Sequence, residues 1–255
     1  MHDLNGQAYT AFLARLRESF LKGTPQVLTA IRDQLSAVVR SERPAAARTQ
    51  LAELSKIVRL LGDHARITNF DQIARMTNAF ALFLDTLQDH PQSINSSTLR
   101  TTTHSVDFLR QLFEGVVRFK NLPSVPPLIL VIDDEPSLTT LVCASLHQAA
   151  LRTIALTDPA DALKVMELNT FDLIFLDVSM PGMDGFEVCT RLRALPANAQ
   201  TPVIFVTGLA DFDNRAQAIL RGGNDLIAKP FLPAELIVKA LTYIYRSQLR
   251  ALGEK

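Results

Sequence analysis

The sequence predicts two domains of different fold class: an antiparallel helical bundle, followed by an α/β domain with a doubly wound parallel sheet. Throughout residues 4–119, apolar residues recur every three to four positions, which is the spacing of amphipathic helices. Residues 128–250 instead alternate short apolar runs with helical patterns, which is typical of strand–helix repeats. Between them, residues 121–127 contain three prolines, which favours an extended, fairly stiff linker. These observations place the domains at residues 1–120 and 128–250.

Composition indicates a globular protein that can bury real cores. Hydrophobic residues make up 47% of the chain and charged residues 20%. No apolar run approaches the ~20 residues of a membrane helix, and Met1-His2-Asp3 lacks the basic and apolar regions of a signal peptide, so we expect a cytoplasmic protein without membrane contact. Charges are too evenly scattered for a nucleic-acid surface. Cys143 and Cys189 lie among apolar residues of predicted helices, which favours buried thiols over a disulfide or metal site.

The first half of the bundle is predicted to contain two helices separated at Gly23. Glycine can end a helix, and Thr24-Pro25 can begin the next as N-cap and first helical residue. The first stripe predicted to face the core is Tyr9, Phe12, Leu13, Leu16 and Phe20, and the second is Val27, Leu28, Ile31, Leu35 and Val38.

Three further helices follow. The first begins after the break at residues 41–44 and stops near Gly62. The second begins at Asn69, with Gln72 as its capping-box partner, and ends at His90-Pro91. The third is capped by Ser96 or Ser97. Their predicted core positions are Leu51, Leu54, Ile57, Val58, Leu61, Phe70, Ile73, Phe80, Leu84, Leu87, Leu99, Val106, Leu109, Phe113 and Val116. Short connections between such helices indicate an antiparallel bundle.

In the second domain, mostly apolar runs bounded by polar residues indicate strands that are covered on both faces. We predict strands near residues 128–132, 152–156, 171–176, 203–206 and 225–228, with helices beginning near residues 137, 159, 184, 211 and 233. Right-handed crossovers between such repeats build a doubly wound parallel sheet.

Polar residues follow four of these strands. Asp133-Asp134 follow the first, Asp177 the third, Thr207 ends the fourth, and Lys229-Pro230 follow the fifth. Because ligands of open parallel sheets bind beyond the carboxyl ends of the strands, we expect these groups at one edge. Three crowded carboxylates repel one another unless a cation neutralises them, and Mg²⁺ prefers such oxygen ligands. A structural calcium site is the alternative, which the nearby lysine disfavours.

The order and spacing of these residues resemble the receiver domain of two-component response regulators. The elements are an acid pair, an aspartate before Met180-Pro181-Gly182-Met183-Asp184-Gly185, a hydroxyl and a Lys-Pro pair. The resemblance covers residues 128–250. It implies a flavodoxin-like (βα)5 fold with strand order 2-1-3-4-5, and a phosphoacceptor protein without substrate turnover. It also implies that a sensor histidine kinase or phosphotransferase phosphorylates Asp177.

The resemblance also implies a role for each site residue. Asp134, Asp177 and the Ser179 carbonyl bind Mg²⁺ directly and Asp133 binds it through water, while Thr207 and Lys229 contact the phosphoryl group. The resemblance further implies a cis peptide at Pro230. Leu226 stands where many receivers carry a switching Tyr or Phe, so the usual coupling from Thr207 is altered. Homodimers are expected through helix four, strand five and helix five, or through the helical bundle.

The N-terminal half is similar to histidine-phosphotransfer domains. The similarity rests on Tyr-x-x-Phe-Leu-x-x-Leu-x-x-x-Phe-Leu from Tyr9 onward and on Leu60-Leu61-Gly62-Asp63. The phosphoacceptor histidine of that family would map to about Arg59, which cannot accept a phosphoryl group. His64 and His104 are the remaining candidates, and each is interpreted as an ordinary surface histidine. We therefore expect a bundle without phosphoacceptor that serves for contacts.

Three hypotheses for the whole chain remain open at this point. In the first, it is a phosphorylation-controlled signalling module. In the second, it is the N-terminal regulatory part of a longer effector such as a diguanylate cyclase, which would follow the helix at residues 234–253. In the third, it is a phosphorelay intermediate in which His64 or His104 receives the phosphoryl group from Asp177.

Overall fold

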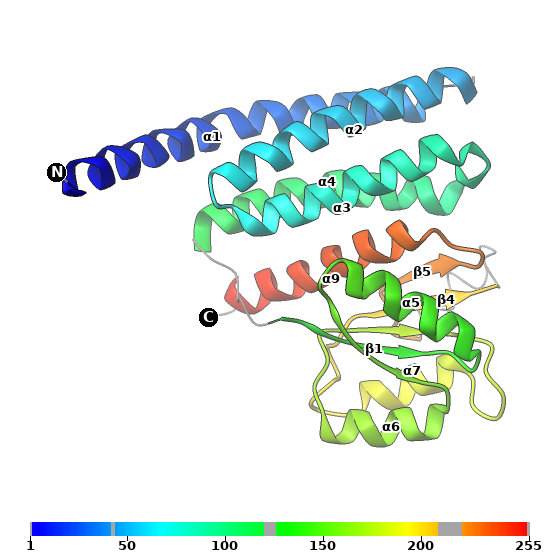
Figure 1. Ribbon diagram of the computed structural model, residues 1–255. Coiled ribbons are helices and arrows are strands. Elements are labelled where there is room, and N and C mark those ends of the chain that lie inside the picture. The colour runs from blue at the N-terminus through cyan, green and yellow to red at the C-terminus, as the bar shows by residue number, and fades with distance from the viewer. Residues whose placement is uncertain (1, 42–43, 120–125, 209–220, 254–255) are drawn as a thin grey trace. The chain divides into compact units, whose positions relative to one another are not determined.

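The computed structural model describes residues 2–41, 44–119, 126–208 and 221–253, and the chain divides into two compact units, Met1–Leu122 and Pro123–Lys255 (Figure 1). Most of the predicted linker and the start of the helix expected near residue 211 lie outside the described residues. Among the described residues, no helix is both long enough and apolar enough to cross a membrane.

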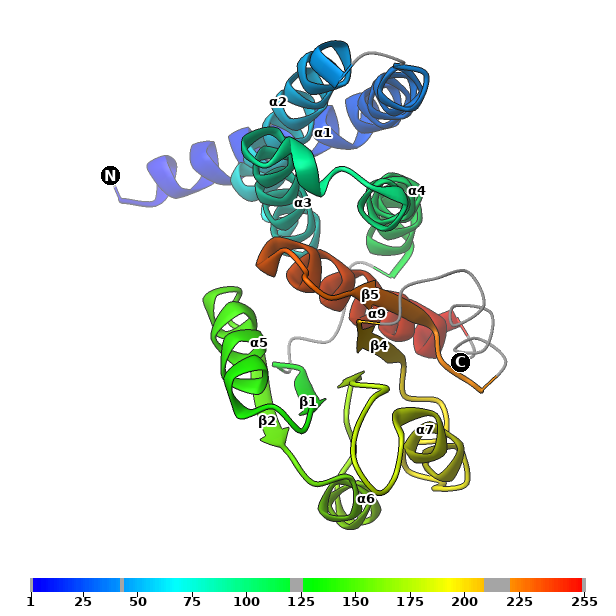
Figure 2. The ribbon, with the colours of Figure 1, turned by 90° about the vertical axis from the view of Figure 1, so that its right-hand side faces the viewer.

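The N-terminal unit is helical, as predicted. Its described part contains α1 (His2–Val39), α2 (Pro44–Ile67), α3 (Asp71–Asp89), a short 3-10 turn η1 (Pro91–Ser93) and α4 (Ser96–Phe119). Helix α2 packs against α1 and α3, and α4 packs against the same two helices, as Figure 2 shows along the helix axes. Apolar side chains that are buried between them include Leu28, Ile31, Leu51, Leu54, Val58, Phe80, Leu84, Leu109 and Leu112.

The predicted break at Gly23 is wrong, because α1 continues through Pro25. A proline inside a helix costs about 3 kcal/mol. Phe20 and the apolar residues that follow Pro25, including Leu28 and Ile31, keep one helical register and are buried. Each such side chain stabilises the fold by roughly 1.5–3 kcal/mol, so their packing outweighs the local signal.

The start of the first stripe was also predicted incorrectly. Tyr9 is 63% exposed and Phe12 is 57% exposed, whereas Phe20 on the same stripe is buried. The apolar spacing therefore predicted the helix correctly but not the exposure of Tyr9 and Phe12.

Gly62 does not end its helix either, because α2 runs on to Ile67. A Cβ atom at Gly62 would lie 2.6 Å from Oγ1 of Thr77 on α3. The glycine therefore allows close approach of α2 and α3. The expected Asn69 capping box is absent from the described termini: Asn69 has φ 58° in the turn, and the N-cap of α3 is Phe70 without a side-chain cap.

The cap of α4 is Asn95 rather than Ser96 or Ser97. Its Oδ1 atom accepts hydrogen bonds from the backbone N–H groups of Ser97 at 2.8 Å and Thr98 at 3.1 Å. Asparagine is among the strongest N-cap residues, and this one satisfies two backbone donors at once.

The C-terminal unit contains a five-stranded parallel sheet in the predicted order 2-1-3-4-5. Its strands are β1 (Leu128–Ile132), β2 (Arg152–Leu156), β3 (Leu173–Leu176), β4 (Val203–Thr207) and β5 (Asp225–Ala228). Helices α5 (Pro136–Gln148) and α9 (Pro233–Gly253) cover one face, and α6 (Pro159–Leu168) and α7 (Gly185–Arg193) cover the other (Figure 2). The core under α6 and α7 includes Leu130, Ile132, Met166, Leu176, Val188, Leu192, Phe205 and Leu226.

Candidate functional site

The sheet register brings the predicted site residues to one edge. Ile132 of β1 pairs with Leu176 of β3, so the next residues, Asp133 and Asp177, leave the sheet side by side. Thr207 of β4 pairs with Ala228 of β5, so Lys229 leaves the sheet one residue later. The site therefore forms where the carboxyl ends of β1 and β3 meet, at the point where the strand order reverses.

The three acidic residues form one cluster. Asp133, Asp134 and Asp177 each offer a carboxylate oxygen, and these oxygens lie within 4.8 Å of one another. Asp133 is 5% exposed and Asp177 is 3% exposed, while Asp134 lies open to solvent. Hard oxygen donors in this arrangement, two buried and one open, fit a divalent cation such as Mg²⁺ that keeps part of its water shell.

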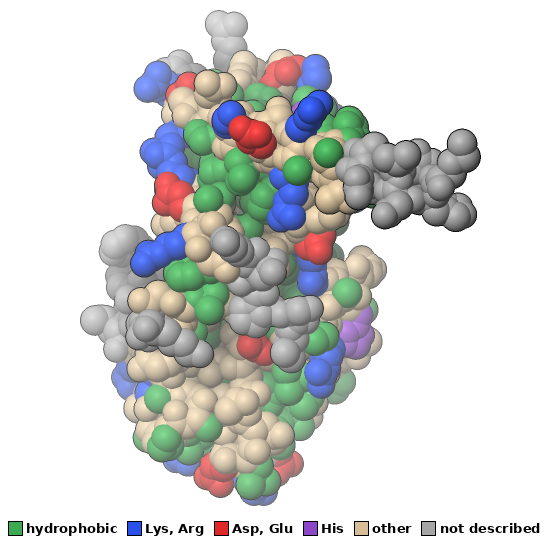
Figure 3. All heavy atoms as spheres, turned by 90° about the vertical axis from the view of Figure 1, so that its left-hand side faces the viewer, with side chains coloured by type: hydrophobic (Ala, Val, Ile, Leu, Met, Phe, Trp, Pro, Cys, Tyr) green, Lys and Arg blue, Asp and Glu red, His purple; other side chains and the backbone are tan. Residues whose placement is uncertain are grey.

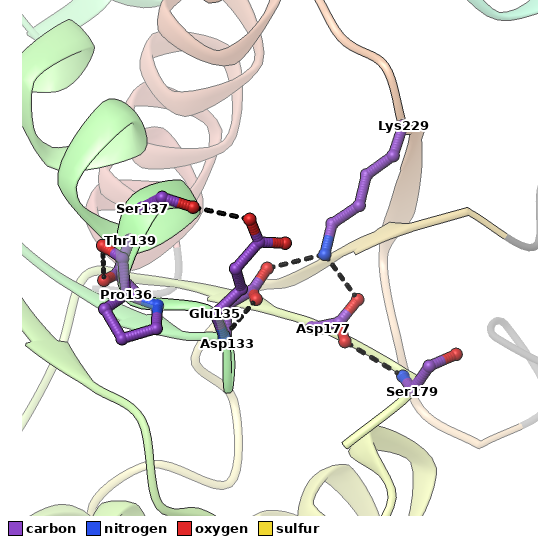
Figure 4. A network of polar contacts seen from close by, with 8 residues as sticks. All are labelled: Asp133, Glu135, Pro136, Ser137, Thr139, Asp177, Ser179 and Lys229. Carbon is purple, nitrogen blue, oxygen red and sulfur yellow. Dashed lines mark hydrogen bonds and ion pairs between the residues drawn. The ribbon is translucent and has the colours of Figure 1, made fainter.

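Lys229 reaches into this cluster from the fifth strand (Figure 4). Its Nζ atom lies 2.7 Å from Oδ2 of Asp133 and 3.0 Å from Oδ1 of Asp177. Burial lowers the pKa of Lys229, but its hydrogen bonds to the two carboxylates outweigh burial and hold the pKa above its ordinary value. Burial raises the pKa of Asp177, and the lysine offsets only part of that rise. The ammonium group thus remains charged and compensates two buried acids.

Backbone amides hold both buried carboxylates in place. The N–H of Ser179 donates to Oδ2 of Asp177 at 3.1 Å, and the N–H of Glu135 donates to Oδ1 of Asp133 at 3.0 Å. The Glu135 side chain accepts a hydrogen bond from Ser137 Oγ (Figure 4). Sequence reasoning assigned no role to Glu135 or Ser137. The signal was an aspartate two residues before the N-cap of a helix that begins with proline, which is a pattern typical of an Asx-turn.

The segment after Asp177 explains much of the Met-Pro-Gly-Met-Asp-Gly pattern. Gly182 has φ +80°, a conformation that other residues rarely adopt. Asp184 is the N-cap of α7 and accepts from the N–H of Glu187 at 2.7 Å. A Cβ atom at Gly185 would lie 2.1 Å from the backbone oxygen of Asp177. These three residues fix the loop that carries Asp177 and the Ser179 carbonyl.

The remaining predicted receiver residues lie around this cluster. Thr207 is buried at the end of β4, and its carbonyl accepts from the N–H of Lys229 at 2.8 Å. The Lys229–Pro230 peptide bond is cis. Leu226 is 1% exposed and belongs to the apolar core under α6 and α7.

The structure places the candidate residues of the helical unit apart from one another. Arg59 of α2 makes an ion pair with Asp85 of α3, which also accepts a hydrogen bond from Ser55 Oγ at 2.6 Å. His64 lies exposed on α2, and His104 lies exposed on α4. Arg59, the position predicted for a phosphoacceptor, is therefore engaged in a contact between α2 and α3.

Comparisons with known proteins concern the C-terminal unit. Residues 129–241 match the family model of the response regulator receiver domain. The alkaline phosphatase synthesis transcriptional regulatory protein PhoP of Bacillus subtilis is 34% identical over 48% of this chain and 50% of its own length. The cyclic di-GMP phosphodiesterase response regulator RpfG of Xanthomonas campestris is 38% identical over 42% of this chain and 29% of its own length.

The solved receiver domain of the Francisella response regulator 1452 is 29% identical, over 48% of this chain and 98% of that one, with a TM-score of 0.45. This chain spans half or less of the length of both curated relatives.

Proposed function

We propose that this chain, whose residues 129–241 form a response regulator receiver domain, is a response regulator of two-component signal transduction that accepts a phosphoryl group on Asp177. The observation that supports this most strongly is the buried acid pair at the edge of the sheet. Asp133 and Asp177 are almost fully buried, yet both contact one lysine and lie within 4.8 Å of a third, exposed acid. Burying charge in this way costs stability, which indicates a functional site.

In the proposed reaction, a carboxylate oxygen of Asp177 attacks the phosphorus of a phosphohistidine on a sensor kinase or phosphotransferase. The new P–O bond forms as the P–N bond breaks, and the released imidazole takes a proton from solvent. Lys229 pairs with one phosphoryl oxygen, and the Thr207 hydroxyl donates to another. Such a transfer needs mainly alignment and neutralisation of the phosphoryl oxygens.

The acidic cluster supports Mg²⁺ as the cofactor. Asp134, Asp177 and the Ser179 carbonyl would hold the ion directly, with Asp133 acting through water. When bound, it supplies positive charge that neutralises a phosphoryl oxygen. Lys229 already bridges Asp133 and Asp177, so this residue is positioned to turn from the carboxylates toward an incoming phosphate.

The helical unit would then serve for contacts rather than for phosphotransfer. Arg59 cannot carry the phosphoryl group, and its ion pair with Asp85 gives this position a structural role. On the receiver side, Leu226 cannot reproduce a rotating ring, so phosphorylation would be transmitted by displacement of Thr207.

Phosphorylation of the full chain with acetyl phosphate and Mg²⁺ tests this function. We expect wild type to incorporate one phosphoryl group that hydroxylamine removes, and Asp177→Asn to incorporate none. Asp184→Asn is the matched control, because asparagine also caps a helix, and it should be labelled like wild type. Undiminished labelling of Asp177→Asn would refute the assignment. Acid-labile label that disappears in His64→Ala or His104→Ala would instead support the phosphorelay hypothesis.

A further inference from the structure

An apolar groove lies on the surface of the helical unit between α1 and α2. It has a volume of about 830 Å³ and is lined by Phe12, Leu16, Phe20 and Val27 of α1 and by Ile57 and Leu60 of α2. Phe12 is 57% exposed and Leu60 is 53% exposed. Figure 3 shows hydrophobic side chains at the surface of the bundle, between charged ones. Large exposed apolar patches on folded proteins usually mark interaction sites.

The wall that α1 contributes continues toward its N-terminus as an apolar stripe that reaches Tyr9. Helix α1 has 38 residues and α2 has 24. At a rise of 1.5 Å per residue, α1 is therefore longer than α2 by about 21 Å. Tyr9, 63% exposed, lies one turn before Phe12 on this stripe. The same helix therefore carries both a projecting apolar stripe and one wall of a groove.

Three charged residues beside the stripe, Arg17, Glu18 and Lys22, have partners within the unit. The guanidinium carbon of Arg17 lies 5.0 Å from the centre of the Phe70 ring, and Glu18 pairs with Lys22 at 2.6 Å. These side chains are engaged locally, so docking at the groove does not require a charged partner.

We propose that the groove binds the part of α1 around Tyr9 and Phe12 from a second copy of this chain. In this arrangement two α1 helices pack antiparallel about a two-fold axis near Leu16. Phe12 of each copy then faces Phe20 of the partner, and Tyr9 faces Gly23 of the partner. Apart from the neighbouring backbone of α1, no described heavy atom lies within 4 Å of the position of a Cβ at Gly23, so the groove has room there for an aromatic ring. Such an interface is isologous, with the same surface used by both copies.

The extent of this surface matches what a dimer needs. From Tyr9 to Val27 the contact surface is roughly 27 Å long. A single helix is about 10 Å wide, and the α2 wall roughly doubles the width of the surface. Each copy therefore contributes on the order of 500 Å², and the pair about 1,000 Å², the lower bound for a specific interface. We accordingly expect a reversible dimer with a dissociation constant in the micromolar range.

Sedimentation of the full chain tests the dimer with variants on both walls of the groove. Phe12→Glu and Leu60→Glu should each raise the dissociation constant at least 100-fold. Both residues are exposed, so the circular dichroism spectrum should be unchanged. The matched control is Leu82→Glu, since Leu82 is 51% exposed on α3 and does not line the groove. A wild type that stays monomeric at 100 µM (about 100-fold above a micromolar constant), or dimers that survive both substitutions, would overturn the proposal.

Disulfide trapping tests the orientation. At an interaxial distance of about 8–10 Å, Cα atoms on a two-fold axis approach to roughly 3–5 Å, which overlaps the range for a disulfide. In a Cys143→Ser background, Leu16→Cys should form a covalent dimer readily, whereas Glu18→Cys on the charged flank should not. Equal rates of disulfide formation in the Leu16→Cys and Glu18→Cys variants would contradict the two-fold arrangement. It would also be contradicted if the chain's own C-terminal unit or another protein occupied the groove. Asp177→Asn should dimerise like wild type, so this result is separate from the fate of the phosphorylation proposal.

Discussion

Charged side chains are held in different ways in the two units. Asp133 and Asp177 of the C-terminal unit are buried around one lysine, and their side chains are 7% and 4% exposed. Arg59 and Asp85 of the helical unit also make an ion pair between elements, but their side chains are 56% and 38% exposed. Solvent screens the Arg59–Asp85 pair, so this pair contributes little to stability. In the buried cluster, removal of any one member would leave a buried charge without its partner. The comparison teaches that burial of an ion pair, and not its presence alone, decides how strongly its members depend on one another.

Glycines show the same contrast. Gly185 lies against the backbone of Asp177, and this backbone cannot move without displacing the site. Gly62 lies against the side chain of Thr77, and this side chain can rotate. Backbone contacts near the site are therefore rigid constraints, and side-chain contacts between helices are adjustable ones.

The largest effect is expected for Gly185→Ala. The added methyl group would lie 2.1 Å from the Asp177 carbonyl oxygen and 2.9 Å from its carbon, so the loop must shift. We expect a loss of at least about 3 kcal/mol in the free energy of unfolding, measured by urea denaturation. Gly208→Ala is the control, because no described heavy atom lies within 4 Å of its Cβ position, and it should change stability by less than about 1 kcal/mol. Equal losses in the two variants would contradict the contrast.

Next in size is the effect of Lys229→Ala on phosphorylation. Removal of the ammonium group leaves Asp133 and Asp177 without compensation and deprives the phosphoryl group of a counter-charge. The initial rate with acetyl phosphate should fall about 100-fold, equivalent to roughly 2.7 kcal/mol in the barrier. Mg²⁺ should bind no more weakly than to wild type, as titration calorimetry would show, because the lysine no longer competes for the carboxylates. A rate like that of wild type would remove Lys229 from the mechanism.

A smaller loss is expected for Gly62→Ala in the helical unit. Its methyl group would contact Thr77 Oγ1, which donates to the carbonyl of Ile73 at 2.8 Å, so the threonine must rotate and lose this bond. We expect a loss of about 1–2 kcal/mol in unfolding free energy. In the double variant Gly62→Ala/Thr77→Ala the losses should not add, since the clashing oxygen is gone. Additive losses would show that the glycine acts in another way.

The strand order was predicted from the resemblance to receiver domains, and the edge at which Asp133 and Asp177 leave the sheet then follows because a parallel sheet leaves little freedom. Once β1 and β3 are recognised as neighbours, Asp133 and Asp177 must leave the same edge, whatever the details of packing. The roles of Glu135 and Ser137 were missed because they arise from a local turn that no strand or helix pattern specifies.

Helix ends were less predictable because they depend on distant contacts. Pro25 and Gly62 are strong local stop signals, yet both lie inside helices whose buried residues continue past them. Tyr9 and Phe12 show a related limit: an apolar stripe indicates that a helix needs a partner, but it does not say whether the same chain supplies it. That distinction requires the three-dimensional arrangement.

The smallest effect is expected for Arg59→Ala. Both partners of the Arg59–Asp85 pair are more than a third exposed, and Asp85 keeps its hydrogen bond from Ser55 when the arginine is removed. The free energy of unfolding should therefore change by less than about 1 kcal/mol, and less again in high salt. Phosphorylation of Asp177 should proceed at the wild-type rate, because the arginine belongs to a contact between helices and not to the receiver site. Urea denaturation and acetyl phosphate labelling of the same preparation measure both quantities. A large loss of labelling in a folded Arg59→Ala variant would mean that this arginine acts on the receiver, and the separation of roles between a buried reactive cluster and a surface pair would no longer hold.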